Sequence, residues 1–125
     1  MRDILFRGKR TDNGKWVYGL LCRVGDTYAN IRRMDTEVLY SVLTNTIGQF
    51  TGGVDKTGKK IFGADIIQGI CNLTGELIIG YVEDHPQTMK YCVHSKDNIV
   101  SLYQCRNIKV IGNIYDNPEL LEVTE

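Results

Sequence analysis

The sequence lacks several features that would point to a particular class of protein. It has only 2 prolines among 125 residues, and no apolar run approaches the roughly 20 residues that cross a membrane. Charged residues interrupt the first ten positions, so no secretory signal peptide is predicted. The 15 Lys and Arg are balanced by 15 Asp and Glu, so no overall positive field attracts polyphosphate or anionic lipid. We therefore expect a cytoplasmic protein with no membrane partner.

The four cysteines also lack a recognisable spacing. Cys22, Cys71, Cys92 and Cys105 form no CxxC pair of the kind that a zinc ribbon or a thioredoxin-like site requires. Because secretion is not predicted, disulfides are not favoured. We expect reduced thiols that act mostly as small buried apolar residues.

What the sequence does contain is typical of a globular chain with many turns. Apolar residues make up 42% of it, and there are 13 glycines. A chain of this length is long enough for one domain with a real core but too short for two ordinary ones. We expect a single compact domain over residues 1–125, within which two lobes are an option.

The clearest local signal is a β-hairpin at the start of the chain. Two β-rich runs, residues 4–10 and 15–22, enclose Asn13-Gly14, and Asn-Gly is the strongest short-range hairpin signal. The second run is apolar on both of its alternating faces. This pattern predicts a central strand that is covered on both sides.

The rest of the chain reads as short strands separated by turns. Residues 37–43 are apolar at nearly every position, and their β-branched and aromatic content favours a strand over a short helix. A polar turn at residues 55–60 and further turns at intervals of roughly ten residues are typical of a small barrel or sandwich. A last strand is predicted at residues 108–115, and Asn117-Pro118 then begins a single helical turn.

Three blocks, in order along the chain, resemble the YopX family of small proteins from phages and prophages. Residues 2–10 with 15–19 are similar to its opening "REILFRGK…NGxWVYG", and residues 46–52 with 55–67 to its "TVGQFTGLxDKNGKxIYEGDIV" signature. Residues 110–121 resemble its closing "VIGNIYENPELL". The chain departs from the pattern where Gly63-Ala64 replaces Glu-Gly. Because the glycine has moved, the position that tolerates positive φ is expected to move with it and reshape the bend before Asp65.

The resemblance implies a fold but no activity. It implies a mainly β fold, with an N-terminal β-hairpin region at residues 1–50, an SH3-like small barrel at residues 51–125 and a short C-terminal helical turn. No enzymatic activity is established for the family. The resemblance also implies a phage or prophage protein that works inside a bacterial host cell.

Individual candidates for chemistry are weak on sequence grounds. Residues 48–52 place two glycines around a short arc but lack the Gly-Lys-Ser/Thr ending of a nucleotide-binding loop, so we interpret them as structural, with Phe50 buried. Asp65 is better suited to accept backbone hydrogen bonds than to act as a base. A metal centre would need at least three ligands from His85, His94, Cys92 and nearby carboxylates such as Glu83, and their spacing is only weak evidence for one. Cys92 with either histidine carries no motif of a catalytic thiol. We predict no catalytic residue, no metal and no cofactor.

Candidate interaction residues fall at the two ends of the chain. Arg7 and Arg10 lie on the first hairpin and Arg32-Arg33 follow it, and with Trp16 and Tyr18 they could present a basic, aromatic face to nucleic acid. Solvated turns explain the same charges and are favoured. Near the C-terminus, Tyr115, Leu120 and Leu121 either fold back on their own domain or dock on a neighbouring copy.

These observations lead to one preferred hypothesis and one alternative. The preferred function is a non-enzymatic binding or assembly module, with another copy of itself or with a host or phage protein as partner. The alternative is a nucleic-acid-binding protein that uses the basic N-terminal hairpin.

Overall fold

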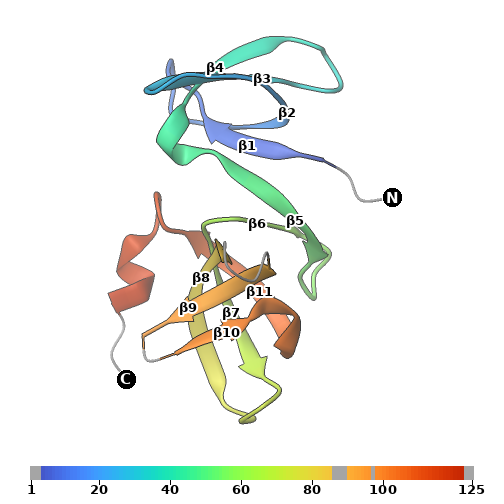
Figure 1. Ribbon diagram of the computed structural model, residues 1–125, viewed down its shortest axis with the longest axis vertical. Helices are drawn as coiled ribbons and strands as arrows, with labels where there is room; N and C mark the ends of the chain where they lie inside the picture. Colours follow the sequence, from blue (N-terminus) through green and yellow to red (C-terminus); the bar gives the residue numbers. More distant parts are fainter. Residues whose placement is uncertain (1–3, 86–89, 97, 123–125) are drawn as a thin grey trace. The chain divides into compact units, whose positions relative to one another are not determined.

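The structure is a computed structural model that describes residues 4–85, 90–96 and 98–122 (Figure 1). It is mainly β and divides into two compact units, Met1–Gly52 and Gly53–Glu125. Within the described residues, no helix is long and apolar enough to span a membrane, and the helical segments are short 3₁₀ turns.

The first unit is built from antiparallel strands. They are β1 (Phe6–Lys9), β2 (Trp16–Val24), β3 (Tyr28–Arg32), β4 (Leu39–Leu43) and β5 (Gly48–Val54), with the 3₁₀ turn η1 (Thr44–Thr46) between the last two. The hydrogen-bonded order is β4-β3-β2-β1-β5 and continues from β5 to β6 (Lys60–Phe62), since β5 runs from the first unit into the second. The predicted hairpin is confirmed, because β1 pairs with β2 from Phe6 opposite Gly19 to Lys9 opposite Trp16. The strand predicted at residues 37–43 is confirmed as β4.

The sheet of the first unit curls because two glycines allow its strands to approach closely. A Cβ at Gly8 would lie 2.9 Å from Cγ2 of Val42, and a Cβ at Gly19 would collide with the carbonyl oxygen of Arg32. The curl brings Arg10, just after β1, into an isolated bridge with Val42 of β4. The buried core residues of this unit are Val17, Ala29, Ile31 and Val42.

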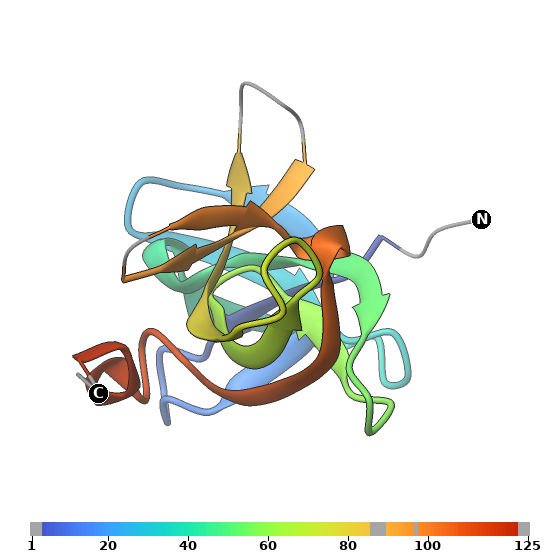
Figure 2. The same ribbon diagram turned by 90° about the horizontal axis from the view of Figure 1, so that it is seen from below.

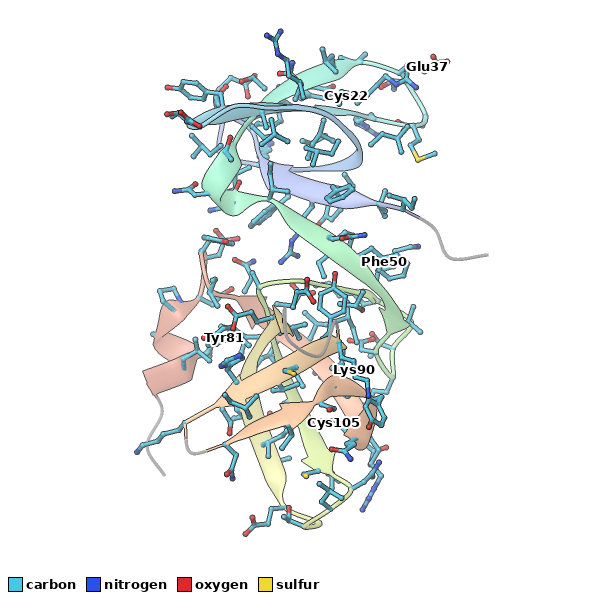
Figure 3. The ribbon with its side chains drawn as sticks, in the orientation of Figure 1. Cys22, Glu37, Phe50, Tyr81, Lys90 and Cys105 are labelled. Atoms are coloured by element: carbon cyan, nitrogen blue, oxygen red, sulfur yellow. The ribbon has the colours of Figure 1, made fainter. Side chains whose placement is uncertain are left out.

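The environment of β2 differs from the prediction in one respect. The strand is central, with β1 on one side and β3 on the other. Its two faces are not both covered, however, because Tyr18 and Cys22 are exposed. A bulge between Leu21 and Arg23 places Cys22 outside the regular pairing with β3, at the end of the strand seen in Figure 3.

The second unit contains a five-stranded antiparallel sheet in the order β10-β9-β8-β7-β11. Its strands are β7 (Asp65–Cys71), β8 (Leu77–His85), β9 (Lys90–Ser95), β10 (Ile99–Ser101) and β11 (Cys105–Asn113), with the 3₁₀ turns η2 (Leu102–Gln104) and η3 (Pro118–Glu122). The helical turn predicted after Asn117 is confirmed as η3, which packs against β8 (Figure 2). The core contains Ile61, Ile67, Val82, Val93, Cys105 and Val110.

The SH3-like barrel predicted for this half is not confirmed. The strands β10 and β11 stand at opposite ends of the sheet order, and the described pairings do not join them into a closed barrel. What the structure establishes is therefore the coarser class, a mainly β protein with two antiparallel sheets.

Candidate binding site

The first unit contains a cavity of about 450 Å³ beside the β1–β2 hairpin. We call it the hairpin cavity. Its lining combines three aromatic rings, two guanidinium groups, one carboxylate and three aliphatic side chains: Trp16, Tyr18, Tyr40, Arg10, Arg33, Asp35, Leu5, Val17 and Met34. The volume lies within the range of about 300–1,000 Å³ that is typical of small-ligand sites.

Local structure explains why these residues converge. The pairing of β1 with β2 sets Lys9 opposite Trp16 and Arg7 opposite Tyr18, so that cations and rings share one face of the hairpin. The loop from β3 to β4 supplies Arg33, and hydrogen bonds from the Arg33 N–H to Val38 O (3.0 Å) and from the Glu37 N–H to Arg33 O (2.9 Å) close it. Glu37 takes a φ of 59° at the outer end of this loop (Figure 3).

Cations lie over the rings of Trp16 and Tyr40. The guanidinium carbon of Arg7 is 4.6 Å from the centre of the Trp16 ring, and Lys9 Nζ is 5.5 Å from the same ring. The guanidinium carbon of Arg10 lies 4.4 Å from the centre of the Tyr40 ring. Such contacts hold the rings and the charges in fixed relative positions.

Each guanidinium of the cavity is also held by the carboxylate two residues further on. Arg10 donates from Nε to Asp12 Oδ1 at 3.0 Å and from Nη2 to Asp12 Oδ2 at 2.6 Å. Arg33 makes the same two hydrogen bonds to Asp35, also at 3.0 and 2.6 Å. We call these pairs the arginine forks. Their hydrogen bonds raise the pKa of each arginine and lower the pKa of each aspartate.

The structure separates the four predicted arginines. Arg10 and Arg33 line the hairpin cavity, and the charge of Arg33 is close enough to lower the pKa of Arg10 slightly against the effect of Asp12. Arg7 is only 4% exposed, so its position is beneath the surface and against Trp16. Arg32 is exposed on β3 and is not part of the cavity lining.

The three predicted C-terminal residues lie in the second unit and are half-buried. Leu120 and Leu121 line a small cavity of about 150 Å³ with Ile79 and His94, so η3 folds back on its own unit. Tyr115 lies in the turn at residues 114–116, where its backbone N–H donates to Asn113 Oδ1 at 3.0 Å.

The two buried aspartates of the second unit accept hydrogen bonds from backbone N–H groups. Asp65 is 1% exposed and accepts a hydrogen bond from the Phe62 N–H at 2.8 Å, as predicted. Asp55 accepts hydrogen bonds from the backbone N–H groups of Thr57, Lys59 and Val110 and from the Thr57 hydroxyl. Burial raises the pKa of Asp55, but these four hydrogen bonds outweigh burial and hold the pKa well below its usual value.

The glycine-flanked segment at residues 48–52 is a strand rather than a phosphate-binding loop. It forms most of β5, and Phe50 is buried as predicted. Gly52 adopts a φ of 94°, so a glycine is needed there for the backbone bend.

The cysteine and histidine candidates are not arranged as a nucleophilic pair. Burial, followed by the nearby charges of Asp84 and Glu83, raises the pKa of Cys92, whereas an activated thiol has a lowered one. His94 stacks on Tyr81, which is labelled in Figure 3, with ring centroids 4.9 Å apart. The Nε2 atom of His94 lies 2.6 Å from Glu83 Oε1. The side chain of His85 lies outside the described part of the structure.

The thiols otherwise match the prediction. All four are free, and Cys71, Cys92 and Cys105 are buried while Cys22 is exposed. Burial raises the pKa of Cys105 to about 11. Within the described ranges, no group of three or more His, Cys, Asp or Glu is placed to hold a metal ion.

Sequence reasoning missed Leu5, Val17, Met34, Asp35 and Tyr40 as parts of the site. One signal was present, because the pattern Arg-x-Asp occurs at Arg10–Asp12 and again at Arg33–Asp35. Nothing in the sequence shows that the two copies lie at one cavity, since that depends on the curl of the sheet.

Fold and site together define a small β protein with two antiparallel sheets and a cavity of ligand size in its first unit. The family model described as "YopX protein" matches residues 5–122, nearly the whole chain. The chain belongs to the YopX family. No match to a curated protein is found.

Proposed function

We propose that this YopX-family protein is a non-enzymatic binding module and that the hairpin cavity is its ligand site. The observation that carries the proposal is the lining of this cavity, in which three aromatic rings surround two guanidinium groups held by Asp12 and Asp35. A site of this kind offers apolar contact area and directed hydrogen-bond donors, which is what specific binding requires.

Two features of the second unit support a function without catalysis. Its buried carboxylates are occupied by backbone N–H groups, and its Cys92 thiol is held in the protonated form. Neither arrangement prepares a base or a nucleophile for reaction.

The proposal is tested by mapping where ligands bind. The protein is titrated with nucleoside monophosphates, single-stranded oligonucleotides, acidic peptides and proline-rich peptides while its amide NMR signals are followed. Binding should shift the signals of residues 10–18 and 33–40 and should weaken at least fivefold in Arg33→Ala. Arg23→Ala, an exposed arginine of the same unit outside the cavity, is the matched control. Binding elsewhere, equal loss in both variants, or no shift with any probe would contradict the proposal.

Self-association is a second candidate, and a difference in charge favours it. The first unit has eight Lys and Arg against five Asp and Glu, a formal charge of +3, and the second has seven against ten, a charge of −3. Opposite charges on the two units favour contact between copies. Light scattering at 50 and 500 mM salt, on the full chain and on a chain lacking residues 117–125, measures this directly. A monomer under all conditions would reject it.

Three further expectations belong to the proposal through the family resemblance. They are an SH3-like barrel within residues 51–125, a phage or prophage origin, and action in the cytoplasm of a bacterial host cell.

A further inference from the structure

We propose that the hairpin cavity accepts unstacked bases of single-stranded nucleic acid, and that its arginines meet the edges of these bases rather than the phosphates. The inference rests on the proposed function, since it names the ligand class of the same cavity.

The aromatic residues provide faces for bases. Tyr18 is 44% exposed at the cavity, whereas Trp16 and Tyr40 are half-buried and each contacts a cation. Stacking of a base on an aromatic ring contributes about 1–3 kcal/mol and tolerates any sequence. Tyr18 is therefore the ring on which a base stacks, and the other two form the wall behind it.

The arginine forks determine how the guanidinium groups bind. Each fork occupies Nε and one N–H of Nη2, and its carboxylate balances the positive charge. The Nη1 side of each guanidinium lies opposite the fork and carries further donors, and Arg33 also forms a hydrogen bond to Tyr40. A charge-balanced donor pair suits the neutral acceptors of a base edge, such as O6 and N7 of guanine, better than a phosphate that needs a net positive charge.

The forks also disfavour an acidic peptide as the ligand. Its carboxylates would compete with Asp12 and Asp35 for the same N–H groups and would gain nothing from the rings. A double helix is disfavoured for another reason, because its bases are stacked on one another and cannot reach Tyr18. A single strand can both stack its bases on the aromatic rings and accept hydrogen bonds from the guanidinium donors.

The charge of the first unit helps such a ligand to approach. Its formal charge of +3 includes the exposed Arg32, next to the fork residue Arg33, while the second unit carries −3. A modest positive field guides a polyanion to the unit, and the bases then determine how tightly it stays.

Trp16 provides a direct readout, because it is the single tryptophan of the chain and lines the cavity. The full-length protein is titrated with a 12-nucleotide single strand of mixed sequence, with the same sequence as a duplex, and with a 12-residue poly-Glu peptide. We expect the single strand to change the fluorescence of Trp16 and to bind at least tenfold more tightly than the duplex. Tyr18→Ala should weaken this binding about five- to 160-fold, in line with the loss of one stacked base.

Salt dependence separates base contacts from phosphate contacts. With about one phosphate neutralised, affinity for the single strand should fall only about threefold between 50 and 200 mM salt, whereas four phosphate contacts would give about 50-fold. Asp35→Asn frees the Arg33 guanidinium and should tighten binding at 50 mM salt and steepen this loss to about sevenfold. Asp26→Asn makes the same charge change at an exposed position of the same unit outside the cavity and should leave the slope nearer to that of the natural protein.

Each outcome decides the inference. A loss near 50-fold in the unmodified protein, equal affinity for duplex and single strand, or equal slopes for the two asparagine variants would overturn base readout. A response to poly-Glu but not to the single strand would overturn the inference and leave the proposed binding function standing. If the NMR panel and this titration both give no binding, the two proposals fail together.

Discussion

The two units of this chain use their carboxylates differently. In the first unit, Asp12 and Asp35 are more than 60% exposed and bind arginine side chains, and Asp35 also accepts a hydrogen bond from the Thr36 N–H at 2.8 Å. In the second, Asp55 and Asp65 are at most 5% exposed and bind backbone N–H groups. Charge in the first unit thus remains at the surface, where a ligand can meet it, whereas in the second it stabilises turns.

This difference explains why the candidate site lies in only one unit. A carboxylate that satisfies several backbone donors cannot change partners without leaving them unpaired, which costs about 1–3 kcal/mol for each donor. An exposed fork can exchange partners at little cost, because surface ion pairs contribute only about 0–1 kcal/mol.

The largest effects should come from glycines at which two strands touch. A Cβ at Gly19 would collide with the carbonyl oxygen of Arg32 in the first unit, and one at Gly80 with that of His94 in the second. Gly19→Ala and Gly80→Ala should each destabilise their own unit by about 4 kcal/mol or more. Amide NMR signals of each unit, followed during chemical denaturation, measure this. The control is Gly75→Ala, where φ is 75° but no atom lies within 4 Å, and only about 1–2 kcal/mol is expected.

The next effect should appear when one buried carboxylate is neutralised. Asp55→Asn replaces an acceptor oxygen with an amide group that cannot accept from the backbone N–H of Val110, now bonded to Oδ2 at 3.0 Å. We expect the second unit to lose about 2–3 kcal/mol of unfolding free energy. Asp12→Asn serves as the matched change in the first unit. Equal losses in the two variants would remove the contrast between the units.

Acidification should destabilise the second unit more than the first. The folded-state pKa of Asp55 lies below its unfolded value, so its ionised form stabilises the fold above about pH 4 and this contribution is lost as the pH falls further. At pH 3 the loss from this residue should be about 1 kcal/mol. Denaturation at pH 6 and pH 3 should show it, and Asp55→Asn should make the pH dependence of the second unit shallower. If Asp55→Asn leaves the pH dependence of stability unchanged, other titratable groups cause it.

A smaller effect, in the stabilising direction, is expected at strained bends. Ala64 has a φ of 74° and Glu37 a φ of 59°, conformations that glycine adopts more easily. Ala64→Gly should stabilise the second unit, and Glu37→Gly the first, by about 0.5–1 kcal/mol. Thermal unfolding measures both. The two gains in stability should be equal, since backbone strain does not depend on how each unit uses its carboxylates. A loss of stability in either variant would contradict the prediction.

The smallest effect on stability is expected at the forks. Asp12→Asn and Asp35→Asn break exposed ion pairs and should leave the denaturation midpoint of the first unit almost unchanged. Chemical denaturation of the first unit checks this. A clear fall in the midpoint would show that the forks stabilise the fold, and it would weaken the interpretation that they serve a ligand.

Local features of the fold could be predicted from the sequence, because neighbouring residues encode them. Asn13-Gly14 predicted the hairpin, Pro118 predicted η3, and the polar run after Val54 predicted the turn that Asp55 now caps. Our prediction for Gly63-Ala64 was wrong. The positive φ did not move with the glycine but is found at Ala64, whose backbone is fixed by hydrogen bonds to Val82 and Ile114.

The candidate site could be predicted only in part. Arg10 and Arg33 were recognised by their charge, but Tyr40 was not, because its place at the cavity follows from its strand register and from the curl of the sheet. Register is a property of pairs of strands, and a short apolar run such as residues 37–43 does not specify it alone. The burial of Arg7 could not be predicted for the same reason.

The bridge between Arg10 and Val42 also limits how another chain could add to the sheet. An edge strand with unpaired backbone groups invites another chain to add to the sheet and begin aggregation. At the outer edge of β4, the bridge and the hydrogen bond from the Thr11 N–H to Ser41 O (3.0 Å) occupy groups that a second chain would need. In the other sheet the edge strands are the three-residue β10 and the irregular β11, which give an incoming strand little regular length. The curl of the sheet therefore also leaves fewer unpaired backbone groups at the edge of β4 for an incoming strand.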